Sequence, residues 1–395
     1  MAGPELIEAK TLRGPMRNRV TEMLGIDVPI FGFTHKPEVA IEVTNAGGMG
    51  ALAASYYQPD ELERILTDMD EKTRGKPYCI DVLFANKVGE VVPMSDRLKA
   101  LPKAHIDFVE KMLDDAGIPP LPPEVEAEML REKPPGHGHT EEGILEVLEI
   151  VVRHKQAKFV LSAMGAPPAY VVERLHRRGI KVGAMAGSAE HALKHVQAGV
   201  DIVVAQGSEA GGHTGTISSM VLWPEVVDAI APIPVLAAGG VGCGRHVAAA
   251  FALGAEGVWC GTIWLGAAES ELSPDMRRKF IAARSQDAIQ RKYDTGKPLR
   301  GLRSKWTDAW DAPGAPQPLP LASQKLLVAP ALKRLELANA IDYMGYMSGQ
   351  IVGRIKKEQP IREIMEDMKR ECQVVMERLG QAPGRAAAKD RTAAG

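Results

Sequence analysis

Short apolar runs rich in β-branched residues alternate with amphipathic segments along the first 285 residues. Such runs suit strands buried on both faces of a parallel sheet, and the segments between them have helical spacing. We predict strands at residues 28–32, 49–54, 78–84, 158–162, 181–185, 201–206, 234–238 and 257–261. We predict helices at residues 37–45, 58–73, 141–154, 168–178, 189–198, 220–230, 245–253 and 274–285. Eight successive strand–helix units predict an α/β fold, a parallel (β/α)8 barrel over residues 17–285.

The regular spacing breaks after the third predicted strand. Residues 85–140 are rich in charge and contain three proline pairs, the last at 134–135. We predict an insertion here that carries one or two short helices. A gap of this length inside a compact domain is usually a functional cover or a mobile segment.

The chain beyond the predicted barrel has a different character. Residues 286–320 show no regular pattern, whereas residues 321–355 and 359–379 have helical periodicity. We predict that residues 286–380 form a helical extension that packs on the barrel. Residues 381–395 are rich in alanine, glycine and charge, and we predict a disordered tail.

The composition argues against several classes of binding partner. The chain is 45% hydrophobic and 25% charged, as in soluble globular proteins. Its 48 Lys+Arg residues nearly balance 50 Asp+Glu residues, and only 5% of residues are aromatic, which argues against nucleic-acid or anionic-membrane binding. The four cysteines form no C-x-x-C pair, which favours a reduced, cytoplasmic setting. We see no apolar signal segment and no run near the ~20 apolar residues of a membrane span.

Histidine pairs raise the question of a metal site. His191 and His195 lie one helical turn apart, and His137 and His139 are separated by one glycine. Neither pair has a third ligand close in the sequence, so we expect a solvated helix face and a loop, and no metal.

Residues 201–215, DIVVAQGSEAGGHTG, carry the strongest candidate chemistry. A buried-strand pattern ends at Gln206 and passes into a glycine-rich loop that contains His213. Glycines at this density let backbone approach a flat ligand closely, and an imidazole just past a strand end can act as acid, base or hydrogen-bond donor. The alternative is a glycine-rich turn with a surface histidine.

Two more glycine-led loops follow predicted strands seven and eight. The first contains Gly239 and Gly240, and the second contains Gly261 and Thr262. In (β/α)8 barrels the loops after these two strands commonly bind phosphate through backbone N–H groups. The alternative is that the glycines only make tight turns. Residues 240–244 resemble a dinucleotide fingerprint, but the strand–helix units upstream argue against that fold. A phosphate site beside the His213 loop favours flavin mononucleotide (FMN), a flat phosphorylated cofactor.

Several motifs resemble the nitronate monooxygenase (2-nitropropane dioxygenase) family. They are TNAGGMG at 44–50, VAQGSEAGGH at 204–213, PVLAAGG at 234–240, GAEGVWCGT at 254–262 and MSGQ at 347–350. The resemblance covers nearly all of residues 17–355 and implies an FMN-dependent (β/α)8 barrel. It implies that His213 is the catalytic histidine. It implies cofactor contacts from Gly32, Gln206, Gly211, Gly239, Gly240, Trp259, Cys260, Gly261 and Thr262.

The chain departs from the family pattern at three places. Asp81 stands where the family commonly has asparagine, and we predict a cofactor contact or a capping acid there. The usual Gln-Met-Gly-Thr run reads WCGT at 259–262, and predicted strand one ends FGFTH, which puts His35 near the barrel mouth. For His35, Tyr343 and Tyr346, a substrate contact and simple packing both remain open. These departures indicate a divergent branch with a different substrate.

The resemblance implies oxidation of nitronates with O2, giving a carbonyl compound and nitrite. An NAD(P)H-dependent FMN reductase of enones, enoyl thioesters or quinones is the alternative, since relatives of this fold carry the same histidine motif. A non-catalytic flavin-binding barrel is the third reading. We expect a small-molecule substrate, and the sequence leaves a homodimer open.

Overall fold

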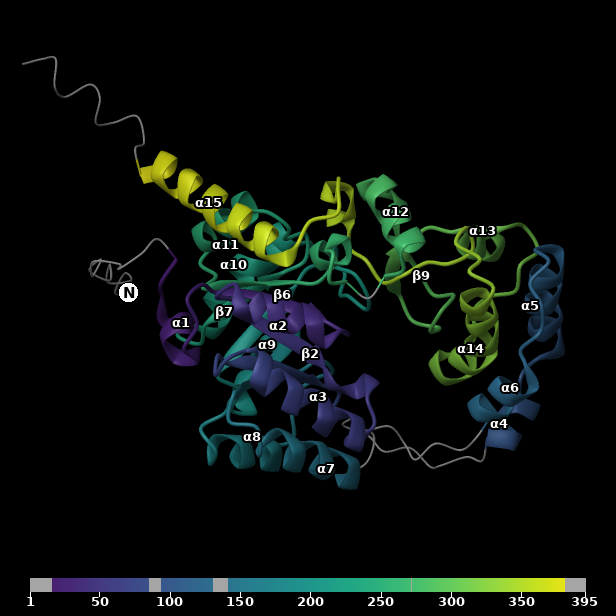
Figure 1. Cartoon of the computed structure of the whole chain (residues 1–395), viewed down its shortest axis with the longest axis horizontal. Coiled ribbons are helices and arrows are strands. Elements are labelled where there is room, and N and C mark those ends of the chain that lie inside the picture. Colours follow the sequence, from purple (N-terminus) through teal and green to yellow (C-terminus); the bar gives the residue numbers. More distant parts are fainter. Residues whose placement is uncertain (1–15, 85–93, 131–140, 271, 381–395) are drawn as a thin grey trace, which may run out of the picture.

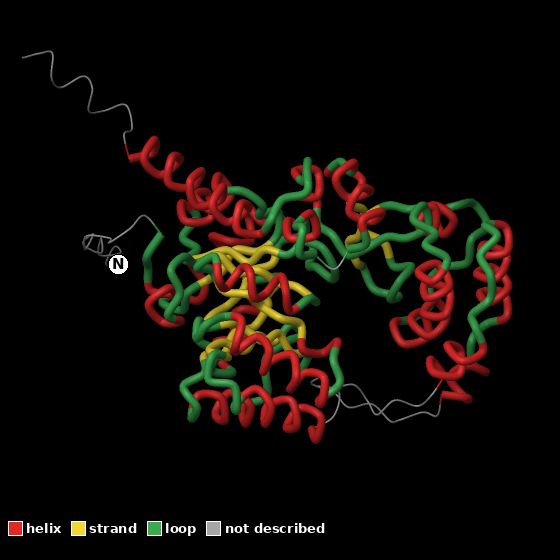
Figure 2. Tube along the Cα trace, in the orientation of Figure 1, coloured by secondary structure: helices red, strands yellow, loops and turns green. Residues whose placement is uncertain are grey.

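The computed structural model describes residues 16–84, 94–130, 141–270 and 272–380. Eight parallel strands form a closed barrel in chain order, as the sequence predicts. The strands are β1 (Ile30–Thr34), β2 (Met49–Ala53), β3 (Tyr78–Val82), β4 (Ala157–Ser162), β5 (Lys181–Ala186), β6 (Ile202–Gln206), β7 (Val235–Ala238) and β8 (Gly257–Cys260). The barrel stands at the centre of the left half of Figure 2, in yellow.

Helices surround the barrel close to their predicted positions. They are α2 (Pro37–Asn45), α3 (Pro59–Lys72), α7 (Glu141–Val151), α8 (Ala169–His176), α9 (Ala189–Gln197), α10 (Ser219–Ile230), α11 (Gly244–Ala252) and α12 (Pro274–Ala282). The last position in the ring differs from the prediction. The C-terminal helix α15 (Ile361–Gly380) packs on α11 and α2, whereas α12 packs chiefly on the 3-10 segments η2 (Thr262–Gly266) and η4 (Gln350–Arg354) (Figure 1). An apolar stripe from Ile361 to Cys372 is buried in this contact.

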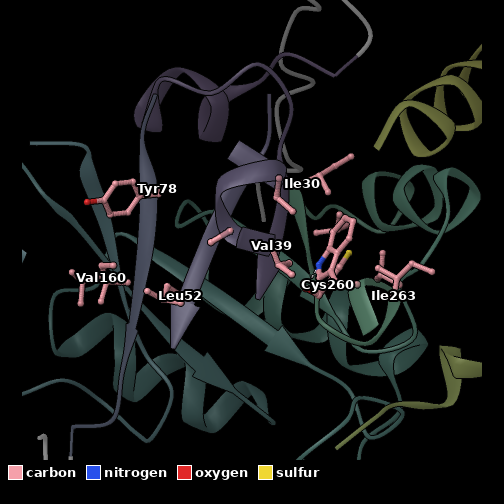
Figure 3. Packing of buried hydrophobic residues seen from close by; sticks show 14 of the residues in the cluster. Ile30, Val39, Leu52, Tyr78, Val160, Cys260 and Ile263 are labelled. Carbon is pink, nitrogen blue, oxygen red and sulfur yellow. Dashed lines mark hydrogen bonds between the residues drawn. The ribbon is translucent and has the colours of Figure 1, made fainter. Parts of the chain in front are cut away.

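Side chains alternate between two cores, because successive residues of a strand point to opposite faces. The barrel interior holds Phe31, Phe159, Leu161, Val204 and Trp259. The short helix α1 (Arg19–Leu24) adds Val20 and Leu24 to this interior cluster. The outer layer lies between strands and helices, and Figure 3 shows part of it, including Ile30, Leu52 and Val160.

The insertion after β3 joins the C-terminal extension in a third core. The described part of the insertion contains α4 (Met94–Lys99), α5 (Lys103–Asp115) and α6 (Pro123–Leu130), one helix more than the sequence pattern predicts. Helix α5 packs with α14 (Leu321–Leu337) and α13 (Lys305–Asp311) around Trp306 and Trp310. These elements lie together to the right of the barrel in Figure 1.

One buried arginine joins the two segments of this third core. The Arg334 guanidinium donates hydrogen bonds to the carbonyl oxygens of Ile118 and Pro119, just beyond α5, and forms an ion pair with Glu110. The contact links positions more than 200 residues apart in the sequence. The insertion therefore packs against part of the extension that we predicted to pack on the barrel.

Residues 286–320 are more ordered than their pattern predicts. They contain an antiparallel hairpin of β9 (Ala288–Arg291) and β10 (Leu299–Leu302), followed by α13. The pattern at 321–355 also overstates the helix, because α14 ends at Leu337 and an irregular segment leads to η4. The predicted tail at 381–395 lies outside the described residues. Within the described ranges, every helix falls short of the length and apolar character needed to cross a bilayer.

Candidate functional site

The carboxyl end of the barrel interior brings two polar side chains into an apolar layer. Asp81 on β3 lies two residues beyond the inward-facing Cys79, and Gln206 on β6 lies two residues beyond the inward-facing Val204. The alternation of a strand therefore turns both toward the interior, at the edge where the loops begin. Trp259, the next-to-last residue of β8, faces the same interior and packs on Phe31 with ring centroids 5.9 Å apart.

Asp81 is a buried acidic residue with a carboxylate oxygen that lacks a hydrogen bond. Its side chain is buried, and its Oδ2 has no hydrogen-bond partner in the described part of the chain. Burial raises the pKa of the carboxyl to about 7, because a charge there loses its hydration. A buried polar atom without a partner costs free energy, which makes Asp81 a candidate for contact with a bound group.

His213 lies on the loop after β6, where its side chain is exposed. Its Nδ1 is 2.9 Å from the carbonyl oxygen of Pro298, on the turn between β9 and β10. A carbonyl oxygen only accepts, so Nδ1 must carry the proton in this hydrogen bond. In the neutral ring Nε2 is then the acceptor, which is the atom that a general base or an anion-binding imidazole uses.

The β9–β10 hairpin also holds the backbone of the His213 loop. Gly212 and Arg300 exchange two backbone hydrogen bonds of 2.8 and 2.9 Å. The Arg300 guanidinium donates to the carbonyl oxygens of Ser208 and Ala288, at 3.1 and 2.8 Å. One side chain thus links Ser208, in the loop after β6, to Ala288 in β9, 80 positions further along the chain.

Glu209, near the start of the loop, ties it to α10, the helix that follows the loop. Its carboxylate accepts hydrogen bonds from the backbone N–H and the hydroxyl of Ser219, the first residue of that helix. A carboxylate at a helix N-terminus satisfies free N–H groups and complements the helix dipole. The loop that bears His213 is therefore held both by the β9–β10 hairpin and by the N-terminus of α10.

The glycine loops after β7 and β8 present backbone. Gly239 and Gly240 have φ values of +95° and +70°, a conformation that favours glycine. A Cβ added at Gly240 would meet no atom within 4 Å, and one at Gly261 would meet only Phe33, at 3.7 Å. Among the described residues, the N–H groups of Gly240, Gly261 and Thr262 donate to no protein acceptor. N–H groups that lack a protein acceptor, at the predicted phosphate position, are suited to bind an anion.

The Ser-Gly-Gln segment closes one side of these loops. The N–H of Gly349 donates to Oγ1 of Thr262 at 2.8 Å, and the N–H of Gln350 donates to the carbonyl oxygen of Glu209 at 2.9 Å. A Cβ at Gly211 would come within 2.8 Å of the Ser348 backbone, so the approach requires glycine there. Ser348 is buried, and its Oγ has no partner in the part of the chain that is described.

Two predicted cofactor residues do not turn their side-chain positions to the barrel interior. Cys260 belongs to the outer core, next to Ile263 in Figure 3, and burial raises its pKa far above the usual thiol range. A Cβ at Gly32 would meet Val43 on α2. The predicted cofactor contact from Cys260 stays a prediction, and it is restricted to the backbone because strand alternation turns Trp259 inward and Cys260 outward. Both residues can offer only backbone to the mouth.

His35 and Tyr346 come together, and Tyr343 lies elsewhere. Nδ1 of His35 is 2.8 Å from the hydroxyl of Tyr346, and the His35 carbonyl accepts a hydrogen bond from Tyr57. Tyr343 packs against the third core beneath Lys305, whose Nζ is 5.7 Å from the ring centroid. The structure therefore supports packing for Tyr343, one of the two roles that the sequence leaves open.

The structure places one of the two histidine pairs that the sequence singles out. Nε2 of His195 is 2.8 Å from the carbonyl oxygen of Met185, so this side chain is used in packing α9 on β5. His137 and His139 lie outside the described residues. Across the described ranges, no group of three or more His, Cys, Asp or Glu side chains is placed to hold a metal ion.

Sequence reasoning missed three contributors, Pro298, Arg300 and Ser348. Pro298 and Arg300 fall in a stretch that has no strand pattern, and their role depends on a contact with a distant loop. Ser348 stands in the recognised MSGQ motif, which could have singled it out.

Fold and site together define a (β/α)8 barrel enzyme, and comparison with known proteins identifies its family. The family model "Nitronate monooxygenase" matches residues 17–371, so the chain belongs to the nitronate monooxygenase family and is an oxidoreductase. It is 42% identical, over 93% of its length and 99% of the relative's, to the "Putative monooxygenase Rv1533" of Mycobacterium tuberculosis. It is 34% identical to the "Probable nitronate monooxygenase" of Staphylococcus saprophyticus, over 74% of this chain and 80% of that protein.

A solved structure supports the same grouping. The nitroalkane oxidase from Streptomyces ansochromogenes superposes with a TM-score of 0.73 at 25% identity, covering 91% of this chain and 99% of that one. The family resemblance predicted from the motifs is therefore confirmed.

Proposed function

We propose that this protein is an FMN-dependent oxidoreductase that oxidises nitronates with O2, releasing nitrite and a carbonyl compound. The observation that carries the proposal is the hydrogen bond from His213 to Pro298, which leaves Nε2 as the acceptor atom of the imidazole. Membership of the nitronate monooxygenase family supports the same activity.

The residues at the barrel mouth fit a phosphorylated flavin. The uncovered N–H groups of Gly240, Gly261 and Thr262 would hold the phosphate. The buried atoms without partners, Asp81 Oδ2 and Ser348 Oγ, are candidates for hydrogen bonds to the cofactor's polar groups. Gln206 and Trp259 face the barrel mouth or interior and would lie near its ring. When bound, FMN supplies electron transfer between the substrate and O2.

His213 would act on the substrate in one of two protonation states. Neutral, its Nε2 would accept the α-proton of a nitroalkane and so form the nitronate. Protonated, the same atom would donate to the nitronate oxygens and orient the anion. In both cases the Pro298 carbonyl keeps Nδ1 as a donor, so the ring need not turn over between the two tasks.

The test is aerobic turnover of propane-2-nitronate and propionate-3-nitronate by the purified protein, with nitrite measured against the same concentration of free FMN. Nitrite release well above the free-flavin rate is expected. A second assay mixes the protein anaerobically with NADH and follows the flavin absorbance. Rapid bleaching together with nitrite release no faster than free FMN would replace the proposal by the NAD(P)H-dependent reductase. A protein that is colourless and takes up no FMN would contradict both.

A further inference from the structure

One acidic side chain at the barrel mouth is buried without a counter-charge. Asp81 is 4% exposed and lies on β3, two residues beyond Cys79, whose side chain faces the barrel interior. Its Oδ2 has no hydrogen-bond partner within the described ranges. A buried ionised carboxylate is normally held by a cation or by several hydrogen-bond donors. Because this oxygen lacks them, the surroundings of Asp81 favour the neutral acid.

The elements that pack against β3 bring no positive charge to this carboxyl. In the parallel sheet Asp81 is paired with Ala53 of β2 and with Leu161 of β4, and both of these side chains are apolar. The 3-10 turn η1 (Ala54–Tyr56) also packs on β3, and its titratable residue, Tyr56, is a phenol that cannot become a cation. The protein around Asp81 therefore does not compensate an ionised carboxylate.

Burial sets the protonation state of Asp81. Loss of hydration raises the pKa of its carboxyl to about 7. Burial also raises the pKa of the neighbouring Cys79 thiol well above its usual range, so this group stays neutral. Gln206, the other polar side chain directed to this edge of the interior, carries no charge at any pH. Near neutral pH the Asp81 carboxyl therefore gains or loses a proton while these neighbours stay unchanged.

Asp81 lies across the barrel mouth from one of the loops proposed to hold phosphate. In the closed ring of eight strands β3 is directly opposite β7, which precedes Gly240. A cofactor whose phosphate is bound at that loop would extend its ring system toward β3. The polar groups of a flavin ring are mostly acceptors, namely carbonyl oxygens and imine nitrogens. An ionised carboxylate can only accept hydrogen bonds, whereas the neutral acid has an O–H donor to offer them.

We propose that Asp81 binds FMN as a neutral acid that donates a hydrogen bond to an acceptor of the flavin ring, so that the cofactor is taken up together with one proton. The inference rests on the proposed function, since it concerns the FMN site of the same protein. The proton comes from solvent and forms the O–H bond of the carboxyl, and no other bond changes. Binding then raises the pKa of Asp81 further, so the affinity for FMN is full below the pKa of the cofactor-free protein and falls as pH rises through it.

The test measures the release of FMN from the full-length holoprotein between pH 7 and pH 9. Diluted samples are equilibrated at each pH, and free FMN is quantified by its fluorescence. The Kd is expected to rise by about tenfold per pH unit above pH 8, the slope for uptake of one proton. The FMN phosphate does not titrate in this range, since the second pKa of a phosphate ester is about 6. Calorimetry of FMN rebinding at pH 8.5, in two buffers of different ionisation enthalpy, should show uptake of about one proton per FMN.

Three variants separate the proton from the hydrogen bond. Asp81→Asn keeps a donor and is neutral at every pH, so its Kd should be independent of pH and its binding should take up no proton. Asp81→Leu has no donor, and its Kd at pH 7 should be about tenfold higher than that of the wild type. Asp294→Asn is the control, because burial also raises the pKa of Asp294 but its carboxylate accepts from Nε1 of Trp306 in the third core. It should keep the wild-type pH profile, and thermal melting at each pH identifies any variant that misfolds.

The results distinguish this inference from the proposed function. An equal Kd at pH 7 and pH 9 in the wild type, or a pH slope that persists in Asp81→Asn, would overturn the role of Asp81. A Kd that decreases with rising pH would overturn it as well, since Asp81 would then accept a hydrogen bond as a carboxylate. Proton-linked FMN binding without nitrite release from nitronates would contradict the proposed reaction and keep the role of Asp81. Nitrite release with a pH-independent FMN affinity would have the opposite meaning, and a protein that holds no FMN would overturn both.

Discussion

Nδ1 of His213 donates a hydrogen bond to the carbonyl oxygen of Pro298, 85 residues further along the chain. The barrel supplies the loop, and the hairpin outside the barrel supplies the acceptor that selects the tautomer. A histidine that is exposed and near the end of a strand could rotate freely. This one is oriented by an element whose sequence gives no sign of that role.

Replacing His213 with asparagine tests the role of Nε2 separately from the anchor. The asparagine amide nitrogen can take the place of Nδ1 and keep the hydrogen bond to Pro298, but nothing replaces Nε2. We expect kcat/KM for a nitroalkane to fall by roughly 10²–10⁴-fold, the usual contribution of a general base, while the FMN content stays constant. Steady-state nitrite release and the flavin absorbance of the purified variant measure the two quantities. His191→Asn, an exposed histidine on α9, is the control; equal turnover in both variants would remove the role of His213.

Replacing Arg300 with methionine should loosen the His213 loop. The change removes hydrogen bonds to the carbonyl oxygens of Ser208 and Ala288, and hydrogen bonds to charged groups contribute about 1.5–3 kcal/mol. We expect a loss of about 2 kcal/mol in the free energy of unfolding by urea, and a lower kcat. Arg303→Met is the matched control, because its ion pair with Asp308 is exposed and screened by solvent, so that its loss should lower the free energy of unfolding much less. Equal losses in the two variants would show that Arg300 is not the link.

Gly240 and Gly211 should respond differently to alanine. At Gly240 a Cβ enters open space, so the fold loses only about 1 kcal/mol for the positive φ, while the added methyl group enters the predicted phosphate position. We expect FMN affinity to fall at least tenfold with a small change in melting temperature. At Gly211 the Cβ collides with the Ser348 backbone, so the melting temperature itself should fall. Titration of the apoprotein with FMN and thermal melting measure these effects; normal FMN affinity in Gly240→Ala would remove that loop from the phosphate site.

Asp81 should make stability depend on pH. Its folded-state pKa of about 7 lies above the usual aspartate value of 3.8, so between these pH values the folded protein holds a proton there that the unfolded chain has lost. Stability therefore falls as pH rises between these two values and is constant above about 7. Asparagine is neutral at every pH, so Asp81→Asn should gain stability relative to wild type by about 2 kcal/mol between pH 5 and pH 8. Urea unfolding of both proteins at the two pH values measures this gain, and an unchanged difference would show that Asp81 does not titrate in this range.

The barrel could be predicted because its signal is local and repeated. Each strand is an apolar run such as Ile202–Gln206, and each helix has its own periodicity, so errors at the ends do not disturb the order of elements. The last helix of the ring could not be assigned in the same way. Both α12 and α15 are amphipathic, and only packing on α11 and α2 selects α15.

The candidate site was likewise predictable only where its residues are neighbours in the sequence. Motifs contiguous in the chain, such as Gly239 with Gly240, were recognised because glycine at a strand end has few other uses. Side-chain direction could not be trusted without the register: a shift of one residue decides whether Trp259 or Cys260 faces the barrel interior. His35 pairs with Tyr346, 311 residues away, and neither local sequence indicates this contact.

The sequence by itself determined the barrel, the family and the histidine loop, because these depend on interactions among neighbours in the chain. The tertiary structure alone decided which atom of His213 is left to react, which helix completes the ring and how the insertion joins the extension. Those outcomes depend on contacts such as His213 with Pro298 and Arg334 with Ile118, whose partners meet only after the chain has folded.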